Sequence, residues 1–301
     1  MFQKLVVIEP LHLLAETEKS FEKYAHQVVR YNTIPDSDQE IISRLDSADA
    51  VLINVTTSIT RRVIEACPSL RYIGMCCTLY EDESCSVDLQ AAKEKRIKVT
   101  GVSGYGDCGV PEFVVSELIS LLHGFHGEQW SSEPLELTDF PVGIIGAGIT
   151  GSLVARYLHF FGATVVYHSR TEKPTLEDVG IRKVSLETLL QSSCAVCTCL
   201  NKFTTLLGNK EFRLLGEHKI LFNTGLSPSY QLPAIKRWLS SGRNYLFCDS
   251  LMALGDKSLL NFPGVVCPGR FAGMSHQSVV RLSKKVEANL SCVADSMIYD
   301  I

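Results

Sequence analysis

The sequence predicts an α/β protein with two domains, each built from a parallel sheet with helices on both faces. Three observations point to this fold class. Short apolar segments alternate with helical patterns along most of the chain, as expected when helices connect parallel strands. One G-x-G-x-x-G turn stands between a strand-like and a helix-like segment near the middle of the chain. The length of 301 residues is enough for two domains.

The first hundred residues alternate between strands and helices. Pro10 ends the first apolar strand, and Ser37 with Glu40 forms a capping box at the start of a helix. Strands are expected over residues 4–8, 27–31, 50–55, 71–77 and 97–102, and helices over residues 11–24, 37–45, 60–66 and 87–96. This part of the chain therefore predicts one small α/β domain.

A glycine-rich break over residues 101–109 follows this domain. Pro111 lies where the first turn of a helix accepts proline, and apolar positions between 113 and 122 give that helix a buried face. Residues 124–139 are polar and irregular, and we expect a connection or a protruding segment there.

The segment 140–171 predicts a dinucleotide-binding strand, turn, helix and strand. The predicted cofactor-binding residues of the turn are Gly146, Ala147, Gly148, Ile149, Thr150 and Gly151. The first glycine permits the tight turn, the second lets the backbone approach a pyrophosphate, and the third lets the helix pack on the strand. The pyrophosphate is expected at the N–H groups of the helix N-terminus. The alternative is a glycine turn with a structural role only.

The end of the second strand predicts which dinucleotide binds. NAD-binding versions of the motif end this strand in an acidic residue that bonds the ribose 2′-hydroxyl. This chain instead has Ser169, Arg170 and Thr171, which can donate hydrogen bonds to a phosphate and pair with it. The pattern favours NADP over NAD. The alternative is that Arg170 is solvated or stacks on adenine, which would leave mixed selectivity.

After this segment the alternation continues. Strands are expected over residues 194–200, 219–223, 245–248 and 265–267, and helices over residues 185–190, 209–215, 232–239 and about 275–294. With the glycine turn they predict a second α/β domain over residues 101–274.

Composition excludes several classes of function. The net charge is −4 and no block of lysine and arginine is present, so we expect no nucleic-acid partner. No apolar run approaches the length of a membrane span. The 11 cysteines are an odd number spread over a long chain, which favours a reducing cytoplasm. Cys194, Cys197 and Cys199 form a single cluster in an apolar strand, so we expect a buried structural role and no metal site.

Six segments carry a family resemblance, in one order between residues 68 and 295. They are VDLQAAKEKRIKV, GVPEFVVSELISLL, GIIGAGITG, SLETLLQSSCAVCTCL, LFNTGLS and the last helix with ANL near its end. In these segments the chain resembles the D-isomer-specific 2-hydroxyacid dehydrogenase family. The resemblance implies two Rossmann-like domains, a small-molecule substrate in the cleft between them, and a homodimer.

The resemblance also implies the domain boundaries and further cofactor contacts. The substrate domain would be discontinuous, comprising residues 1–100 plus 275–301, and the dinucleotide-binding domain would comprise residues 101–274. Further cofactor-binding residues implied by the matched strand ends are Asn223, Thr224, Gly225 and Asp249.

The chain departs from the family at its catalytic positions. The family uses an arginine, a glutamate and a histidine, and Leu226, Leu254 and Gly269 stand at the corresponding positions here. We therefore expect a rearranged site with an apolar pocket formed by Leu226 and Leu254. The loop CCTLYEDESCSVDL, which is longer and more acidic than the family's glycine-rich turn, argues against a small carboxylate substrate.

Four residues are candidates for the missing chemistry. Arg270, next to the lost histidine, can hold an anion or stabilise an oxyanion. His276 can supply a proton from a shifted position. Tyr105 in the glycine-rich break and Tyr230 beside the Leu226 turn carry hydroxyl groups. Three of them have a plainer alternative: a backbone or phosphate contact or a solvated side chain for Arg270, a surface or capping position for His276, and a turn role for Tyr105.

Two functions follow from these patterns. The first is an NADP-dependent oxidoreductase that reduces a carbonyl or related unsaturated group with a non-standard active site. The second is a catalytically degenerate, nucleotide-binding regulatory protein, which the loss of all three catalytic groups suggests.

Overall fold

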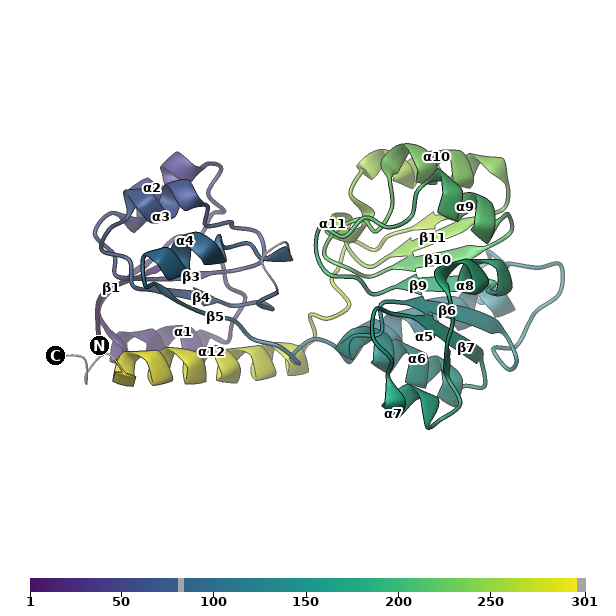
Figure 1. Cartoon of the computed structure of the whole chain (residues 1–301), viewed down its shortest axis with the longest axis horizontal. Coiled ribbons are helices and arrows are strands. Elements are labelled where there is room, and N and C mark those ends of the chain that lie inside the picture. Colours follow the sequence, from purple (N-terminus) through teal and green to yellow (C-terminus); the bar gives the residue numbers. More distant parts are fainter. Residues whose placement is uncertain (81–83, 297–301) are drawn as a thin grey trace. The chain divides into compact units, whose positions relative to one another are not determined.

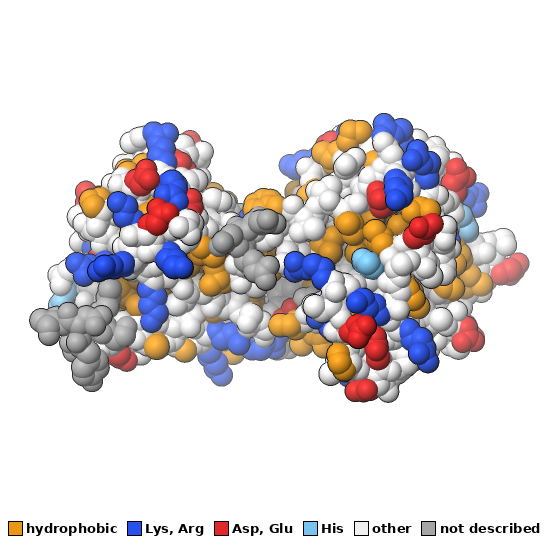
Figure 2. All heavy atoms as spheres, in the orientation of Figure 1, with side chains coloured by type: hydrophobic (Ala, Val, Ile, Leu, Met, Phe, Trp, Pro, Cys, Tyr) orange, Lys and Arg blue, Asp and Glu red, His pale blue; other side chains and the backbone are white. Residues whose placement is uncertain are grey.

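The computed structural model describes residues 1–80 and 84–296, and the chain separates into two compact units. Unit 1 comprises Met1–Tyr105 together with the chain from Ser275 onward, and unit 2 comprises Gly106–Met274. Within the described residues, no helix has both the length and the apolar character needed to cross a membrane. On the face shown in Figure 2, lysine and arginine side chains are interspersed with aspartate and glutamate on each unit.

Unit 1 is built on a parallel sheet with the strand order β2-β1-β3-β4-β5. Its strands are β1 (Phe2–Val7), β2 (Ala25–Arg30), β3 (Ala50–Ile53), β4 (Tyr72–Met75) and β5 (Lys98–Thr100). Its helices are α1 (Ala15–Ser20), α2 (Asp38–Leu45), α3 (Arg61–Ala66), α4 (Leu89–Glu94) and α12 (His276–Ser296). The two faces of the sheet carry different helices, with α2, α3 and α4 on one face and α1 and α12 on the other (Figure 1).

The burial pattern explains why α12 returns to unit 1. Leu282, Val286, Leu290 and Val293 recur along one side of this helix and are buried against the sheet. The side chains of β1 and β3 alternate between the two faces, because successive residues of a strand point in opposite directions. Tyr72 of β4 stacks on Phe2 of β1 with ring centroids 5.4 Å apart, which fills the α12 side of the sheet.

Unit 2 is built on a longer parallel sheet with the strand order β12-β11-β10-β9-β6-β7-β8. Its strands are β6 (Pro141–Ile145), β7 (Thr164–His168), β8 (Arg182–Lys183), β9 (Ala195–Thr198), β10 (Ile220–Asn223), β11 (Tyr245–Cys248) and β12 (Val265–Val266). The order reverses between β6 and β9. In open α/β sheets, ligands bind at the carboxyl ends of the strands beside such a reversal.

Helices cover both faces of the second sheet. The α helices of unit 2 are α5 (Gly109–His123), α6 (Ile149–Phe160), α7 (Pro174–Glu177), α8 (Leu186–Ser192), α9 (Asn209–Leu215), α10 (Leu232–Ser241) and α11 (Leu251–Leu254). Apolar residues of α5 and α6 pack on one face, and those of α8, α9, α10 and α11 pack on the other (Figure 1). The predicted fold class, two parallel sheets with helices on both faces, is thus confirmed.

The predicted helix over residues 11–24 is the largest difference. The α helix spans only Ala15–Ser20, and a 3₁₀ turn over Phe21–Lys23 follows it. His12 has a φ of +56°, outside the right-handed helical region, so the helix begins only after it. At the predicted capping box, Ser37 Oγ does accept a hydrogen bond from the Glu40 backbone N–H, but the Glu40 carboxylate accepts from the Asp36 N–H.

Candidate nucleotide-binding site

The glycine turn lies at the carboxyl end of β6, beside the reversal of the strand order. Gly146 has a φ of +92°, in the left-handed region that favours glycine, and a Cβ atom there would lie 2.5 Å from the Cys199 carbonyl oxygen. Its N–H donates to the His168 carbonyl at 2.9 Å, which joins the turn to the end of β7. The first glycine is therefore required by backbone conformation and by close packing.

The other two glycines have different physical roles. A Cβ atom on Gly151 would lie 1.9 Å from the Gly146 carbonyl oxygen, so only glycine lets α6 approach the turn. Gly148, by contrast, has open space around the position of its absent Cβ, with no atom within 4 Å. Open space at the second glycine is what a pyrophosphate needs in order to approach the backbone.

The N-terminus of α6 faces the same open region. Gly148 is the N-cap residue and has no side chain to satisfy the first backbone N–H groups of the helix. Ile149 is 60% exposed, Ala147 is buried, and the Thr150 hydroxyl donates to Asp107 Oδ1 at 2.5 Å. Of the predicted turn residues, Ala147 and Thr150 thus have side chains that are buried or engaged, which leaves their backbone groups for a ligand.

The loop Ser169-Arg170-Thr171 follows directly on β7. Arg170 and Thr171 are exposed and Ser169 is half-buried, and no carboxylate occurs among these three residues. The Tyr167 hydroxyl fixes the far end of the loop, because it accepts from the Lys173 N–H at 2.7 Å and donates to Glu177 Oε1 at 3.1 Å. No sequence signal pointed to Tyr167, since its role depends on the folded position of α7.

Asn223, predicted to bind the cofactor, instead has a buried and fully engaged side chain. Its Oδ1 accepts from the Thr198 hydroxyl at 2.7 Å, and its Nδ2 donates to the carbonyls of Ser227 and Ala253 at 3.1 and 2.8 Å. The Ser229 hydroxyl donates to Thr198 Oγ1 at 2.9 Å. This network holds the turn after β10 in place. The Asn223 side chain therefore supports the backbone of that turn from within the core.

The turn after β10 carries the remaining predicted residues of this strand end. Thr224, Gly225 and Leu226 are half-buried. Burial raises the pKa of the Cys199 thiol to about 12, although a hydrogen bond with the Thr224 side chain opposes the rise. Cys199 is thus a neutral neighbour of the turn at physiological pH.

Asp249 lies at the carboxyl end of β11 and is 3% exposed. Its Oδ2 accepts from the Ala272 N–H at 2.8 Å, and its carbonyl accepts from the Arg270 N–H at 2.7 Å. Its Oδ1 is buried without a hydrogen-bond partner in the described part of the chain. Burial raises the pKa of this carboxyl to about 6. A buried, unpartnered acceptor suits the N–H of a ligand.

Of the candidate catalytic residues, Arg270 and Tyr230 belong to unit 2 and differ sharply in exposure. The Arg270 side chain is exposed, and it forms no ion pair with the described residues. Tyr230 is 2% exposed, and its hydroxyl donates to the Leu254 carbonyl at 3.0 Å. Because that hydroxyl lies in the core and donates to a backbone carbonyl, the Tyr230 side chain is not available to a substrate.

Tyr105 and His276 belong to unit 1. Tyr105 is half-buried against the core beside α12, and its carbonyl accepts from Arg281 Nε at 2.8 Å. His276 is the exposed first residue of α12. Within unit 2, the glycine turn, Asp249 and Arg270 therefore form the candidate site.

The structure corrects the predicted apolar pocket. Leu254 is fully buried in the core formed with α10 and α11, so it cannot line a pocket with Leu226. Gly269 has a φ of +73°, where a histidine would be strained. Position 269 thus has a backbone conformation that suits glycine, and glycine provides no catalytic side chain.

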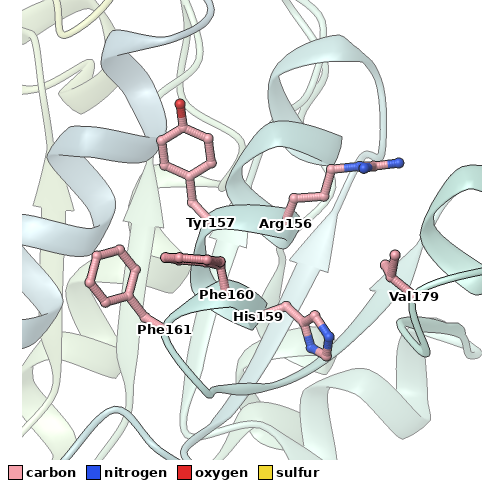
Figure 3. Close-up of a pocket in the computed structure, with 6 residues that line it drawn as sticks. All are labelled: Arg156, Tyr157, His159, Phe160, Phe161 and Val179. Atoms are coloured by element: carbon pink, nitrogen blue, oxygen red, sulfur yellow. The ribbon is translucent and has the colours of Figure 1, made fainter.

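A surface pocket of about 520 Å³ lies elsewhere on unit 2, at the C-terminal end of α6. Figure 3 shows Phe160 and Phe161 side by side, with Arg156 and Val179 on the α7 side of the pocket. The Arg156 guanidinium donates to the Thr175 carbonyl at 2.6 Å. Within residues 1–80 and 84–296, no group of three His, Cys, Asp or Glu side chains is placed to hold a metal ion.

Comparison with known proteins bears out the resemblance. The family model described as D-isomer specific 2-hydroxyacid dehydrogenase, catalytic domain, matches residues 5–297. A hydroxypyruvate reductase of Blautia hydrogenotrophica is 28% identical over 244 residues, covering 75% of this chain and 74% of its own. A glyoxylate reductase of Thermococcus litoralis is 24% identical over 284 residues, covering 86% and 84%.

Two solved structures share the fold over almost the whole chain. The D-lactate dehydrogenase of Escherichia coli has a TM-score of 0.78 at 19% identity, with 98% of each chain covered. An acyclic imino acid reductase (Bsp5), in complex with NADPH and D-Arg, has a TM-score of 0.81 at 21% identity, with 98% of each chain covered.

Proposed function

Since the chain belongs to the D-isomer-specific 2-hydroxyacid dehydrogenase family, whose members bind a nicotinamide dinucleotide, we propose that it is an NADP-dependent oxidoreductase. It transfers a hydride to a carbonyl-type carbon, with Arg270 in place of the family's catalytic set. The observation that carries this proposal is the intact glycine turn, joined by the Gly146–His168 hydrogen bond to a strand end that bears arginine and no carboxylate.

The residues of unit 2 fit the cofactor in two independent ways. The open space above Gly148 admits a pyrophosphate to the N-terminus of α6. The unpartnered Oδ1 of Asp249 can accept an N–H of the nicotinamide carboxamide. When bound, the reduced nicotinamide supplies the hydride.

Selectivity for NADP is assigned to the loop after β7. Arg170 offers a bidentate fork to the 2′-phosphate, and Ser169 and Thr171 add hydroxyl donors. The backbone at the far end of the loop is held by the Tyr167–Lys173 hydrogen bond, which supports a loop conformation that is set before the cofactor binds.

Arg270 holds the anionic or polar group of the substrate. Its backbone is fixed to Asp249 by a hydrogen bond, whereas its exposed guanidinium is available to a ligand. Leu226 replaces a cation at the turn after β10, which favours a substrate with an apolar portion. Imines belong in the substrate panel beside carbonyls, since the acyclic imino acid reductase is similar in fold.

The test combines cofactor binding with turnover. NADPH and NADH are titrated by intrinsic fluorescence, and consumption of the bound cofactor is followed with a panel of 2-oxo acids, aldehydes, ketones and imines. Arg270→Ala should leave NADPH affinity within about twofold and lower kcat/KM by about a hundredfold. Arg243→Ala, which removes an exposed arginine before β11, is the matched control. NADPH binding without turnover on any substrate would contradict the proposal.

That last outcome would favour the second function, a nucleotide-binding regulatory protein without catalysis. The observation behind it is the apolar or glycine residue at each of the positions Leu226, Leu254 and Gly269. It predicts that NADPH alters the affinity for a partner and that Arg270→Ala has no kinetic phenotype to measure.

We also propose that the chain forms a homodimer through the outer side of α6. Phe160 at the C-terminal end of this helix is 86% exposed, and Phe161 beside it is 48% exposed. Large aromatic side chains beside a surface pocket are typical of interfaces.

The free cysteine Cys108 and the half-buried Cys267 suit a reducing compartment, in keeping with the expected cytoplasmic location.

A further inference from the structure

Two reduced cysteines lie where neighbouring strands of the second sheet end, since Cys248 is the last residue of β11 and Cys267 directly follows β12. Strands β11 and β12 are parallel, with Leu246 opposite Val265 and Phe247 opposite Val266. Cys248 and Cys267 are the residues that follow directly on these two pairs. Neighbouring strands lie about 4.8 Å apart, which is within the Cα separation of about 4.4–6.8 Å that a disulfide requires.

The two thiols also lie on the same face of the sheet. Leu246 and Cys248 belong to the core formed with α10 and α11, and Val265 and Cys267 pack against that same core. The two segments stay in contact beyond the cysteines, because the Asp249 carbonyl accepts the Arg270 N–H at 2.7 Å, although the regular strand pairing ends at Phe247 and Val266. Strand pairing before the cysteines and a hydrogen bond after them thus hold the two segments next to each other.

We propose that Cys248 and Cys267 form a reversible disulfide, so that this sheet edge is a redox-sensitive modification site beside the nucleotide-binding residues. The oxidant class is a low-molecular-weight disulfide. The half-buried Cys267 thiolate attacks one of its sulfurs, forms a mixed disulfide and releases one thiolate. The Cys248 thiolate then attacks the Cys267 sulfur and expels the second thiolate. The two protein thiols supply the two protons, so one small disulfide yields two small thiols.

The surroundings set the order and the rate of these steps. Cys248 is fully buried, and burial raises the pKa of its thiol. The hydrogen bond with the Tyr230 hydroxyl at 3.7 Å opposes this rise, and the nearby Cys267 and Asp249 add to it. Burial likewise raises the pKa of Cys267, although the Gly269 N–H donates to its sulfur and opposes the rise. Oxidation should therefore begin at the more accessible Cys267 and accelerate as the pH rises, since the thiolate is the nucleophile.

Closure of the disulfide would move residues of the proposed site. β12 is a two-residue strand at the edge of the sheet, so it can shift toward β11 more easily than a central strand. Cys267 leads through Pro268 and Gly269 to Arg270, and Cys248 precedes Asp249. A shift of Cys267 toward Cys248 therefore displaces Arg270 and strains the hydrogen bonds that Asp249 makes to Arg270 and Ala272.

Peptide mapping tests the disulfide without reference to cofactor or activity. The full-length protein is incubated with oxidised glutathione, quenched with an alkylating agent and digested, and linked peptides are identified by mass spectrometry. The wild type should yield a peptide pair joined at Cys248 and Cys267. Cys248→Ser should accumulate glutathione on Cys267, Cys267→Ser should yield neither product, and Cys108→Ser, which removes an exposed cysteine, should retain the linked pair.

Two results would overturn the proposal. One is a wild type that accumulates glutathione on Cys267 without closing the pair. The other is a wild type in which Cys108 and Cys292 are modified while Cys248 and Cys267 stay reduced. A parallel NADPH titration should show about a tenfold loss of affinity in the oxidised wild type, absent from oxidised Cys267→Ser and reversed by dithiothreitol. Failure of the mapping would leave the proposed oxidoreductase function untouched.

Discussion

A Cβ atom on Gly151 would lie 1.9 Å from the carbonyl oxygen of Gly146, so the third glycine of the turn is required by packing within unit 2 itself. Gly151→Ala should force α6 away from β6. We expect a loss of about 1–3 kcal/mol in the free energy of unfolding, measured by urea denaturation, together with weaker NADPH binding.

Gly148→Ala is the matched control, because nothing lies within 4 Å of the added methyl group. Its stability should stay within about 0.5 kcal/mol of the wild type, as is usual at exposed positions. NADPH affinity should nevertheless fall by about tenfold or more, since the methyl group occupies the approach of the pyrophosphate. Equal effects of the two substitutions on stability and on binding would contradict this division of roles.

The parts of the fold that the sequence predicts are those with local signals. The alternation of strand and helix patterns gives both sheets, and the glycine spacing gives the turn between β6 and α6. The requirement for glycine at position 151 is also local, since the atom that a Cβ would meet is the Gly146 carbonyl oxygen of the same strand–turn–helix unit, whereas Gly146 is constrained as well by the distant Cys199 carbonyl. Local chemistry therefore suffices to predict the fold class and the cofactor turn.

The environments of individual side chains depend on contacts that the sequence does not reveal. Asn223 follows a strand in a position suited to a cofactor, but its amide is engaged by Ala253, which lies 30 residues away. Leu254 stands at a predicted catalytic position, yet the short helix α11 turns it into the core. In both cases a long-range packing arrangement decides whether a side chain is available to a ligand.

Arg170 should determine the preference for NADP. Arg170→Ala should weaken NADPH binding by ten- to a hundredfold, or about 1.4–2.8 kcal/mol, and change NADH binding by less than about twofold. The physical reason is the loss of the cation that pairs with the 2′-phosphate. The measurement is the ratio of the two dissociation constants by fluorescence titration.

Arg182→Ala provides the control for this prediction. Arg182 is an exposed arginine on the neighbouring strand, opposite Val166 of β7. Its removal lowers the positive charge of the region by the same amount, and it should leave the ratio of NADPH to NADH affinity unchanged. If both variants reduced the ratio equally, net charge and not a specific phosphate contact would account for selectivity.

Phe160 should stabilise the proposed dimer. Phe160→Glu places a charge in an apolar contact, so sedimentation equilibrium should show a monomer, with a dissociation constant raised by about a hundredfold. Leu260→Glu, which changes another exposed apolar residue of unit 2 (45% exposed), should leave the assembly unchanged. A wild type that is monomeric at all accessible concentrations would exclude this interface.

Asp249 should impose a pH dependence on stability. Its pKa is raised by burial from 3.8 to about 6, so the folded chain holds this proton more tightly than the unfolded chain does. The stabilisation is fully present below about pH 4, is lost as the pH rises through about 6, and is constant above that. The shift corresponds to an upper bound of about 3 kcal/mol.

Asp249→Asn should remove this slope, because the amide does not ionise in the window while its oxygen can still accept the Ala272 N–H. Urea unfolding at several values between pH 4 and pH 7 measures the effect. Asp256→Asn is the control: the Lys236 ammonium, which donates to it, holds the pKa of Asp256 down at about 2, so its titration lies below the window. If the slope survived in Asp249→Asn and vanished in Asp256→Asn, the buried carboxyl would not be its source.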